Sequence, residues 1–276
     1  MTMENAEQQE KKVNVPRSRV RGLDVPTFTD QYEKRRWMLQ HMATVLRVFG
    51  RKGYNEGCAG HVTIVDPVDP TTYWINPIGI HFSMITVSDI VHVNSQGEPI
   101  GGSMAPFNAA GFRIHSAMHR ARPDIEAICH AHSFYARTYS VFGKELEMLT
   151  QDSCLVHDNQ IAFAQYEGVG LDEVEGQKIA SVLGNKMCIL LQNHGVMTVG
   201  KTVDEAGYLH VLMENMCKTQ LLVDAVANNS HIEKKIISDK IAKRAFKDIS
   251  SPNGLYAAMQ PDLELEIYLS KDEVLR

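Results

Sequence analysis

Hydrophobic positions recur with a helical period in several long segments of the chain. Met38, Met42, Val45 and Phe49 follow one another at steps of four, three and four, which is the spacing of one helical face. Asp30 with Glu33 resembles a capping box ahead of that helix, and glycines follow it at positions 50 and 53. Comparable patterns predict further helices over about 107–121, 133–142 and 173–183, and a long helix from the Thr202–Glu205 capping box to about residue 226.

Short apolar or alternating runs lie between these helices and predict β-strands. The runs cover residues 61–65, 73–76, 90–93, 125–132 and 186–191, and turn residues such as those of 66–70 and 94–97 separate several of them. Helices that alternate with short strands favour a layered α/β or α+β domain.

The two ends of the chain differ from its middle. Residues 1–28 are polar and without an apolar period, and we expect a flexible N-terminal arm ahead of a domain over 29–228. Residues 229–276 read as a C-terminal extension that packs on another surface, with a neighbouring subunit as one option. Within it, Leu263–Ile267 alternates as an isolated strand would.

Composition narrows the class of protein. The chain has 44% hydrophobic and 22% charged residues, as an ordinary globular protein does, and its net charge of -5 argues against a nucleic-acid-binding surface. The first twenty residues lack an apolar core of the kind found in signal peptides, and no apolar run reaches membrane-spanning length. Five cysteines without a C-x-x-C pair do not form a disulfide framework, so we expect a reducing cytoplasm or nucleus.

Three histidines carry the chemistry that stands out most. His130 and His132 are two residues apart on a predicted strand, so both imidazoles point to one face. His194 lies where another buried strand ends, and Gly195 permits a sharp turn there. A single such histidine is more often a hydrogen-bonded structural residue than a metal ligand. Three neutral nitrogen ligands together suit zinc, iron or another late first-row ion.

The surrounding motifs resemble the class II aldolase/adducin family. These motifs are the helix over 107–121, the Ala-Arg-Pro-Asp turn at 121–124, the His-x-His strand, Gln192–Gly195, and the glycine loops at 55–60 and 76–79. The resemblance covers about residues 35–226. It implies a three-layer α/β/α sandwich with a mixed central sheet, and His130, His132 and His194 as ligands of one divalent metal per subunit. Zinc is the ion that we expect, with iron and manganese as alternatives, and the resemblance implies a homotetramer.

The chain departs from the sugar-phosphate aldolases of that family around the predicted metal site. Gly111 stands where those aldolases carry a glutamate, and a glycine is neither a ligand nor a base through its side chain. Ala109 and Ala110 replace serines that help to hold the substrate phosphate, and alanine offers no hydroxyl. Gln151 falls near the position of a tyrosine that some aldolases use as a proton donor. A nonphosphorylated substrate fits these changes.

Other polar residues are candidates for the substrate pocket. The candidates are His61, His81, Asn108, Gly111, His115 and Gln151. Asp152 is a candidate to orient a ligand histidine through a hydrogen bond. Each of them taken alone is more often a hydrogen-bonded structural residue.

Three functions remain open. The first is a metal-dependent lyase for aldol-type cleavage, decarboxylation or dehydration of a small hydroxy-carbonyl compound. The second is a non-haem iron oxygenase or decarboxylase, since aminocoumarin-biosynthesis proteins of this fold resemble the chain in lacking the aldolase carboxylate. The third is a non-enzymatic, adducin-like protein that binds actin. No membrane or nucleic-acid partner is expected.

Overall fold

Seven α-helices and several 3-10 turns make up the helical part of the described chain. The structure is a computed structural model, and it describes residues 23–276 except 167, 169–172 and 231. The α-helices are α1 (Gln31–Arg51), α2 (Ala109–Ala121), α3 (Phe134–Ser140), α4 (Glu173–Leu183), α5 (Val203–Ser230), α6 (Asp239–Ile249) and α7 (Pro252–Ser270). Each helix predicted from the apolar period is present, and Asp30 caps α1 by accepting from the Tyr32 backbone N–H at 2.8 Å.

One mixed β-sheet forms the centre of the domain. The described residues give eight strands: β1 (His61–Val65), β2 (Tyr73–Ile75), β3 (Val91–Val93), β4 (Pro99–Gly102), β5 (Ala127–Ala131), β6 (Gln160–Phe163), β7 (Cys188–Leu191) and β8 (Gly195–Gly200). Their order is β4-β3-β2-β1-β5-β8-β7-β6, and β6 with β7 is the parallel pair. The mixed sheet that the sequence predicted is therefore confirmed, while β4, β6 and β8 were missed.

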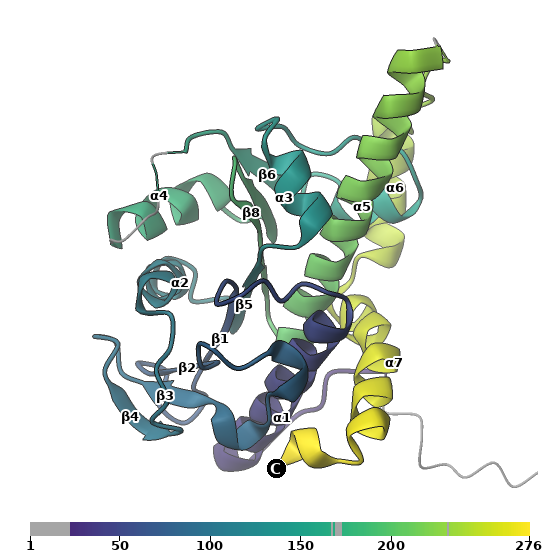
Figure 1. The fold of residues 1–276 in the computed structure, drawn as a ribbon. Helices are drawn as coiled ribbons and strands as arrows, with labels where there is room; N and C mark the ends of the chain where they lie inside the picture. Colours follow the sequence, from purple (N-terminus) through teal and green to yellow (C-terminus); the bar gives the residue numbers. More distant parts are fainter. Residues whose placement is uncertain (1–22, 167, 169–172, 231) are drawn as a thin grey trace, which may run out of the picture.

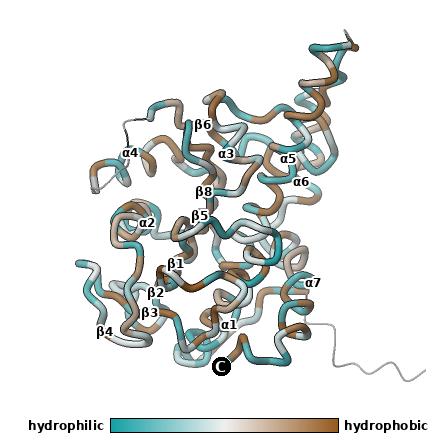
Figure 2. Tube along the Cα trace, in the orientation of Figure 1, coloured by the Kyte–Doolittle hydropathy of each residue, from teal (hydrophilic) through white to brown (hydrophobic). Residues whose placement is uncertain are grey.

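The helices cover both faces of this sheet and give three layers (Figure 1). Helices α2 and α4 pack on one face through Ile128 and its apolar neighbours on β7 and β8. Helices α1, α5 and α7 pack on the other face against Val62, Ile64 and Cys129. Side chains alternate along each strand, so His61 and His130 point toward the α2 layer. The α/β/α sandwich is thus confirmed, and Figure 2 shows hydrophobic stretches where the layers meet.

The C-terminal extension is helical, and the strand predicted over Leu263–Ile267 is wrong. Met259, Leu263 and Ile267 are four residues apart and bury one face of α7 in the core that α1 and α5 share. Glu266 is also buried, where it pairs with Arg51 of α1. The alternation of Leu and Glu therefore coincided with a helical i, i+4 pattern, which a five-residue window does not distinguish from a strand.

The N-terminal arm lies mostly outside the described residues. Of the predicted 1–28 segment the structure describes residues 23–28, where the Phe28 ring packs 5.4 Å from the Trp37 ring and Asp24 accepts from Asn253 at 3.1 Å. No helix in the described ranges combines the length and hydrophobicity that crossing a bilayer requires.

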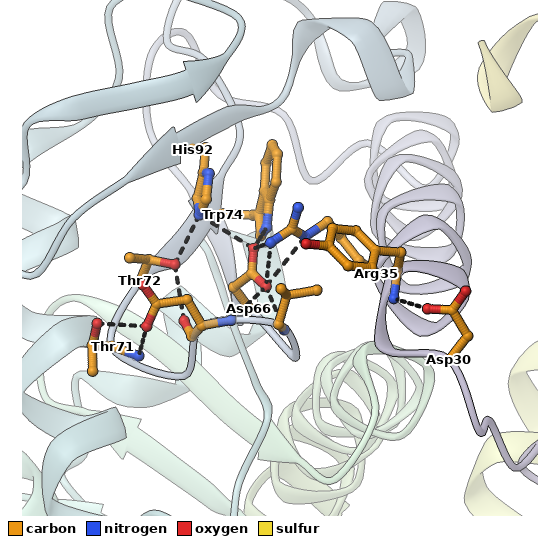
Figure 3. Close-up of polar contacts among 10 residues, drawn as sticks. Asp30, Arg35, Asp66, Thr71, Thr72, Trp74 and His92 are labelled. Carbon is orange, nitrogen blue, oxygen red and sulfur yellow. Dashed lines mark hydrogen bonds and ion pairs between the residues drawn. The ribbon is translucent and has the colours of Figure 1, made fainter.

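A buried carboxylate ties α1 to the turn between β1 and β2 (Figure 3). The Asp66 side chain is fully buried and accepts hydrogen bonds from Arg35 of α1, from the Trp74 indole at 2.7 Å and from the Val68 backbone N–H at 2.7 Å. His92 lies 3.2 Å from the same carboxylate and stacks on Trp74. Because each carboxylate oxygen has donors, the buried charge is compensated.

Replacing this carboxylate should cost a large share of the folding stability. We expect Asp66→Asn to lower the free energy of unfolding by about 3 kcal/mol, because Arg35 would lose its buried counter-charge. Urea denaturation measures the change, with Asp248→Asn on the exposed face of α6 as the matched control. Equal stability of the two variants would refute the role of Asp66.

Candidate metal centre

Three histidines from two adjacent β-strand ends converge on one point. His130 lies on β5, His132 follows that strand, and His194 lies in the turn between β7 and β8. Their ring centroids are 4.8–5.1 Å apart, the rings stand edge to face, and their nitrogen donors lie within 4.8 Å of one another. The His-x-His spacing therefore places both imidazoles together, as the strand period predicted.

The turn that carries His194 needs unusual backbone conformations on both sides. Asn193 has φ of 59° and Gly195 has φ of 153°, both in regions that ordinary side chains rarely adopt. A Cβ on Gly195 would also lie 3.3 Å from the Ala131 carbonyl oxygen. The glycine therefore lets the turn come close to β5 and brings His194 within reach of the other two histidines.

The donor set fits a late first-row divalent ion. The Nδ1 of His130 donates to the Val196 carbonyl oxygen at 3.0 Å, which leaves its Nε2 with a free lone pair. Burial lowers the pKa of His194 to about 4 and also lowers the pKa values of His130 and His132. The three imidazoles are thus neutral near pH 7, which is the form that ligates a metal. At His130 the backbone carbonyl of Val196 orients the ring, which is the role that we suggested for Asp152.

A cavity of about 320 Å³ opens on the triad. The pocket candidates His61, Asn108 and Gly111 line it together with the three histidines. Asn108 caps α2 by accepting from the Gly111 backbone N–H at 2.9 Å. His115 is fully buried behind His61 and does not reach the cavity.

Two of the predicted pocket residues lie elsewhere in the described chain. His81 is exposed, and its Nδ1 accepts from the Ser83 backbone N–H at 3.1 Å at the start of a short 3-10 helix, Phe82–Met84. Gln151 is exposed in the turn before the 3-10 helix Asp152–Val156 and does not line the cavity. The structure of one chain therefore gives neither of them a place at the site.

The His61 ring fills the space beside Gly111. A Cβ built on Gly111 would lie 2.2–2.7 Å from three atoms of the His61 ring, which is too close for any side chain. His61 is 5% exposed, and neither of its ring nitrogens has a hydrogen-bond partner among the described residues. Burial lowers the pKa of His61 to about 3, so the ring is neutral. Gly111 and His61 are therefore sterically coupled, and the histidine faces the cavity where an aldolase-type carboxylate has no room.

A row of buried polar side chains extends from His61 along α2. The His61 and His115 rings are 4.2 Å apart, and Thr63 Oγ1 lies 2.9 Å from both His115 Nδ1 and His119 Nε2. A hydroxyl has one proton, so at least one of the two histidines donates to Thr63. The i, i+4 spacing of His115 and His119 thus lets both rings contact the Thr63 hydroxyl, and these buried polar groups pack behind the cavity-lining His61.

The sequence did not single out three further lining residues, Arg137, Tyr166 and Asn193. Asn193 adjoins His194, and its left-handed backbone is common for asparagine. Arg137 follows His132 by five residues on α3, and nothing in its neighbourhood separates it from an ordinary exposed arginine.

Comparison with known proteins agrees with this fold. The family model "Class II Aldolase and Adducin N-terminal domain" matches residues 40–221, and the chain belongs to that family. A solved structure described as L-fuculose 1-phosphate aldolase from Glaciozyma antarctica PI12 superposes with a TM-score of 0.82 at 34% identity, covering 91% of this chain and 97% of that one.

Two sequence relatives extend the comparison. The Schizosaccharomyces pombe protein named "Meiotically up-regulated gene 14 protein" is 45% identical over 257 residues, which cover 93% of this chain and 98% of the relative. A Streptomyces roseochromogenus subsp. oscitans protein named 4-hydroxy-3-prenylphenylpyruvate oxygenase/4-hydroxy-3-prenylbenzoate synthase is 37% identical, covering 76% of each chain.

A double-mutant cycle tests the packing of His61 against Gly111. Gly111→Ala should lower the free energy of unfolding by about 2 kcal/mol, because the new Cβ overlaps the His61 ring. In a His61→Ala background the same change should cost nothing or stabilise by up to about 1 kcal/mol, as Ala does in a helix. Urea denaturation of the four proteins gives the coupling energy. An equal cost in both backgrounds would show that the two residues are independent.

Proposed function

We propose that the protein is a metal-dependent lyase that acts on a small, nonphosphorylated hydroxy-carbonyl substrate. The observation that carries this proposal is the convergence of three neutral imidazoles on a cavity of about 320 Å³. His130, His132 and His194 would hold one divalent ion per subunit, with zinc expected and iron or manganese as alternatives. Three protein ligands leave positions for substrate, as in catalytic rather than structural sites.

The residues around the triad define what the chain itself contributes. A bound divalent ion supplies Lewis acidity that polarises a carbonyl oxygen of the substrate. Val196 holds His130 in the required tautomer through its carbonyl oxygen. Asn108 and Asn193 line the cavity and offer amide groups for substrate hydroxyls.

His61 takes the role for which the family's aldolases use a carboxylate. Its neutral ring has one donor and one acceptor nitrogen, and both lack partners among the described residues. A buried polar group without partners is costly in folding, and a small rotation of the ring toward the cavity that it lines would let a substrate oxygen satisfy it. His61 would therefore orient a substrate hydroxyl or carbonyl by a hydrogen bond.

The residues at the start of α2 favour a substrate without a phosphate group. Ala110 lines the cavity, and neither it nor Ala109 has a hydroxyl to donate to an anion. Solved relatives named for sugar phosphates share the fold, but the chain lacks these donors at the corresponding place.

A second candidate is a non-haem iron oxygenase on the same triad. The relative named 4-hydroxy-3-prenylphenylpyruvate oxygenase/4-hydroxy-3-prenylbenzoate synthase supports it, and a three-ligand site with open positions suits ferrous iron. Oxygen uptake that requires added ferrous iron would favour this candidate over the lyase.

Two further expectations stay proposals. An adducin-like role with actin rests on the family resemblance alone, and cosedimentation with actin filaments is the direct test. Association between chains, with a homotetramer expected from the family resemblance, is supported by apolar side chains that are exposed on a single chain, such as Phe134, Phe142 and Leu222.

The lyase proposal is tested by turnover with matched substrates. Zinc-loaded full-length protein should release aldehyde or carbon dioxide from nonphosphorylated aldol or oxo-acid substrates, and should not prefer L-fuculose 1-phosphate over L-fuculose. His61→Ala should lower kcat/KM by at least about tenfold at unchanged zinc content, because an interaction with the reacting substrate is lost. His81→Ala is the matched control, because His81 lies outside the cavity.

The proposal would fail if the zinc-loaded protein turned over no aldol, decarboxylation or dehydration substrate. A marked preference for the phosphorylated sugar would overturn the substrate assignment but leave the lyase class in place.

A further inference from the structure

The formally charged side chain on the described part of the cavity lining is a cation. Arg137 is that cation, and the other described lining residues are histidine, asparagine, tyrosine, glycine or apolar residues. A divalent ion on the triad would add further positive charge. A guanidinium and a metal ion on one cavity wall attract anions, and Glu56, outside the lining, offsets part of the Arg137 charge.

Arg137 lies on helix α3, whose first turn is anchored by the neighbouring helix α5. The backbone N–H groups of Tyr135 and Ala136, in the first turn of α3, donate to the Glu214 carboxylate at 2.9 and 2.7 Å. Glu214 is 5% exposed and belongs to α5, against which α3 packs (Figure 1). The Arg137 side chain therefore extends from a helix backbone that is held by hydrogen bonds, and not from a loop.

The Arg137 guanidinium forms a hydrogen bond through Nη1 but not through its Nε–Nη2 edge. Nη1 donates to the Glu56 carboxylate, whose pKa is lowered by this hydrogen bond. Nε and Nη2 make no hydrogen bond among the described residues. The Nε–Nη2 edge presents two parallel N–H groups, the geometry that binds a carboxylate through both oxygens.

A purely structural role accounts poorly for this pair. The Arg137 and Glu56 side chains are 37% and 50% exposed, and exposed ion pairs contribute little to folding stability. The pair uses the Nη1 group of the guanidinium, and no hydrogen bond to a described residue occupies Nε or Nη2 of this cavity-lining arginine.

We propose that Arg137 binds a carboxylate of the substrate, and that the site therefore takes small 2-oxo or 2-hydroxy carboxylates. This inference rests on the proposed function and specifies its substrate class. The carboxylate would lie on the Nε–Nη2 edge while the neighbouring carbonyl or hydroxyl faces the histidine triad. A phosphate fits less well, because the cavity offers one cation and Ala109 and Ala110 supply no hydroxyl donors.

Binding of matched probes tests the inference without requiring turnover. Pyruvate, its uncharged analogue pyruvamide and inorganic phosphate would be titrated calorimetrically into full-length protein, both zinc-loaded and metal-free. Arg137→Gln removes the charge, Arg137→Lys keeps it without the planar edge, and Glu56→Gln breaks the ion pair but keeps the arginine. Zinc content and the unfolding midpoint of every variant would be measured alongside.

We expect Arg137→Gln to weaken pyruvate binding at least about tenfold and to leave pyruvamide binding unchanged, with Arg137→Lys in between. Glu56→Gln should keep pyruvate binding within about threefold of the parent protein. The weakening by Arg137→Gln should occur with and without zinc, so it is independent of whether the lyase proposal holds.

Three results would overturn the inference. One is equal binding of pyruvate and pyruvamide to the parent protein. Another is an equal loss of pyruvate binding in Glu56→Gln and Arg137→Gln, which would mean that the ion pair acts only structurally. The third is a dependence on Arg137 for inorganic phosphate but not for pyruvate.

Discussion

The antiparallel register of β5 between β1 and β8 is the constraint on which the site depends. It sets His130 opposite His61 on one side and opposite Met197 on the other, with all three on the face that α2 covers. A shift by one residue would turn His130 into the apolar layer beneath α1. Because β8 continues from the turn that carries His194, the same register also fixes the distance between the third histidine and the other two.

The polar groups near these strands differ from those that the family resemblance implies for sugar-phosphate aldolases. Gly111 has no side chain, and the His61 ring occupies the space beside it. Arg137 and Glu56 place a cation at the cavity wall, while Ala110 leaves the start of α2 without a hydroxyl donor. The cavity thus combines imidazoles with a guanidinium on a fold shared with a structure described as L-fuculose 1-phosphate aldolase, and our proposals assign these groups to the substrate.

The sequence predicted what depends on local period and missed what depends on contacts distant in the chain. Five of the seven described helices, five strands and the His130–His132 pair follow from spacings of two to four residues. The sequence predicted the turn at Gly195 but not the strand β8 that begins with that residue, and the five residues of Leu263–Ile267 were too few to separate helix from strand. The place of Arg137 depends on Glu214 and Glu56, which lie about 80 residues away. No local pattern carries that information, whereas His81 and Gln151 looked like site residues only through their motifs.

Elemental analysis of natively purified full-length protein tests the central claim most directly. The account predicts about one zinc, iron or manganese ion per chain in the parent protein and in His81→Ala, and almost none in His130→Ala or His132→Ala. Circular dichroism should show that both triad variants remain folded, because the core of the sheet is apolar around these positions. Metal content unchanged in both triad variants would contradict the account.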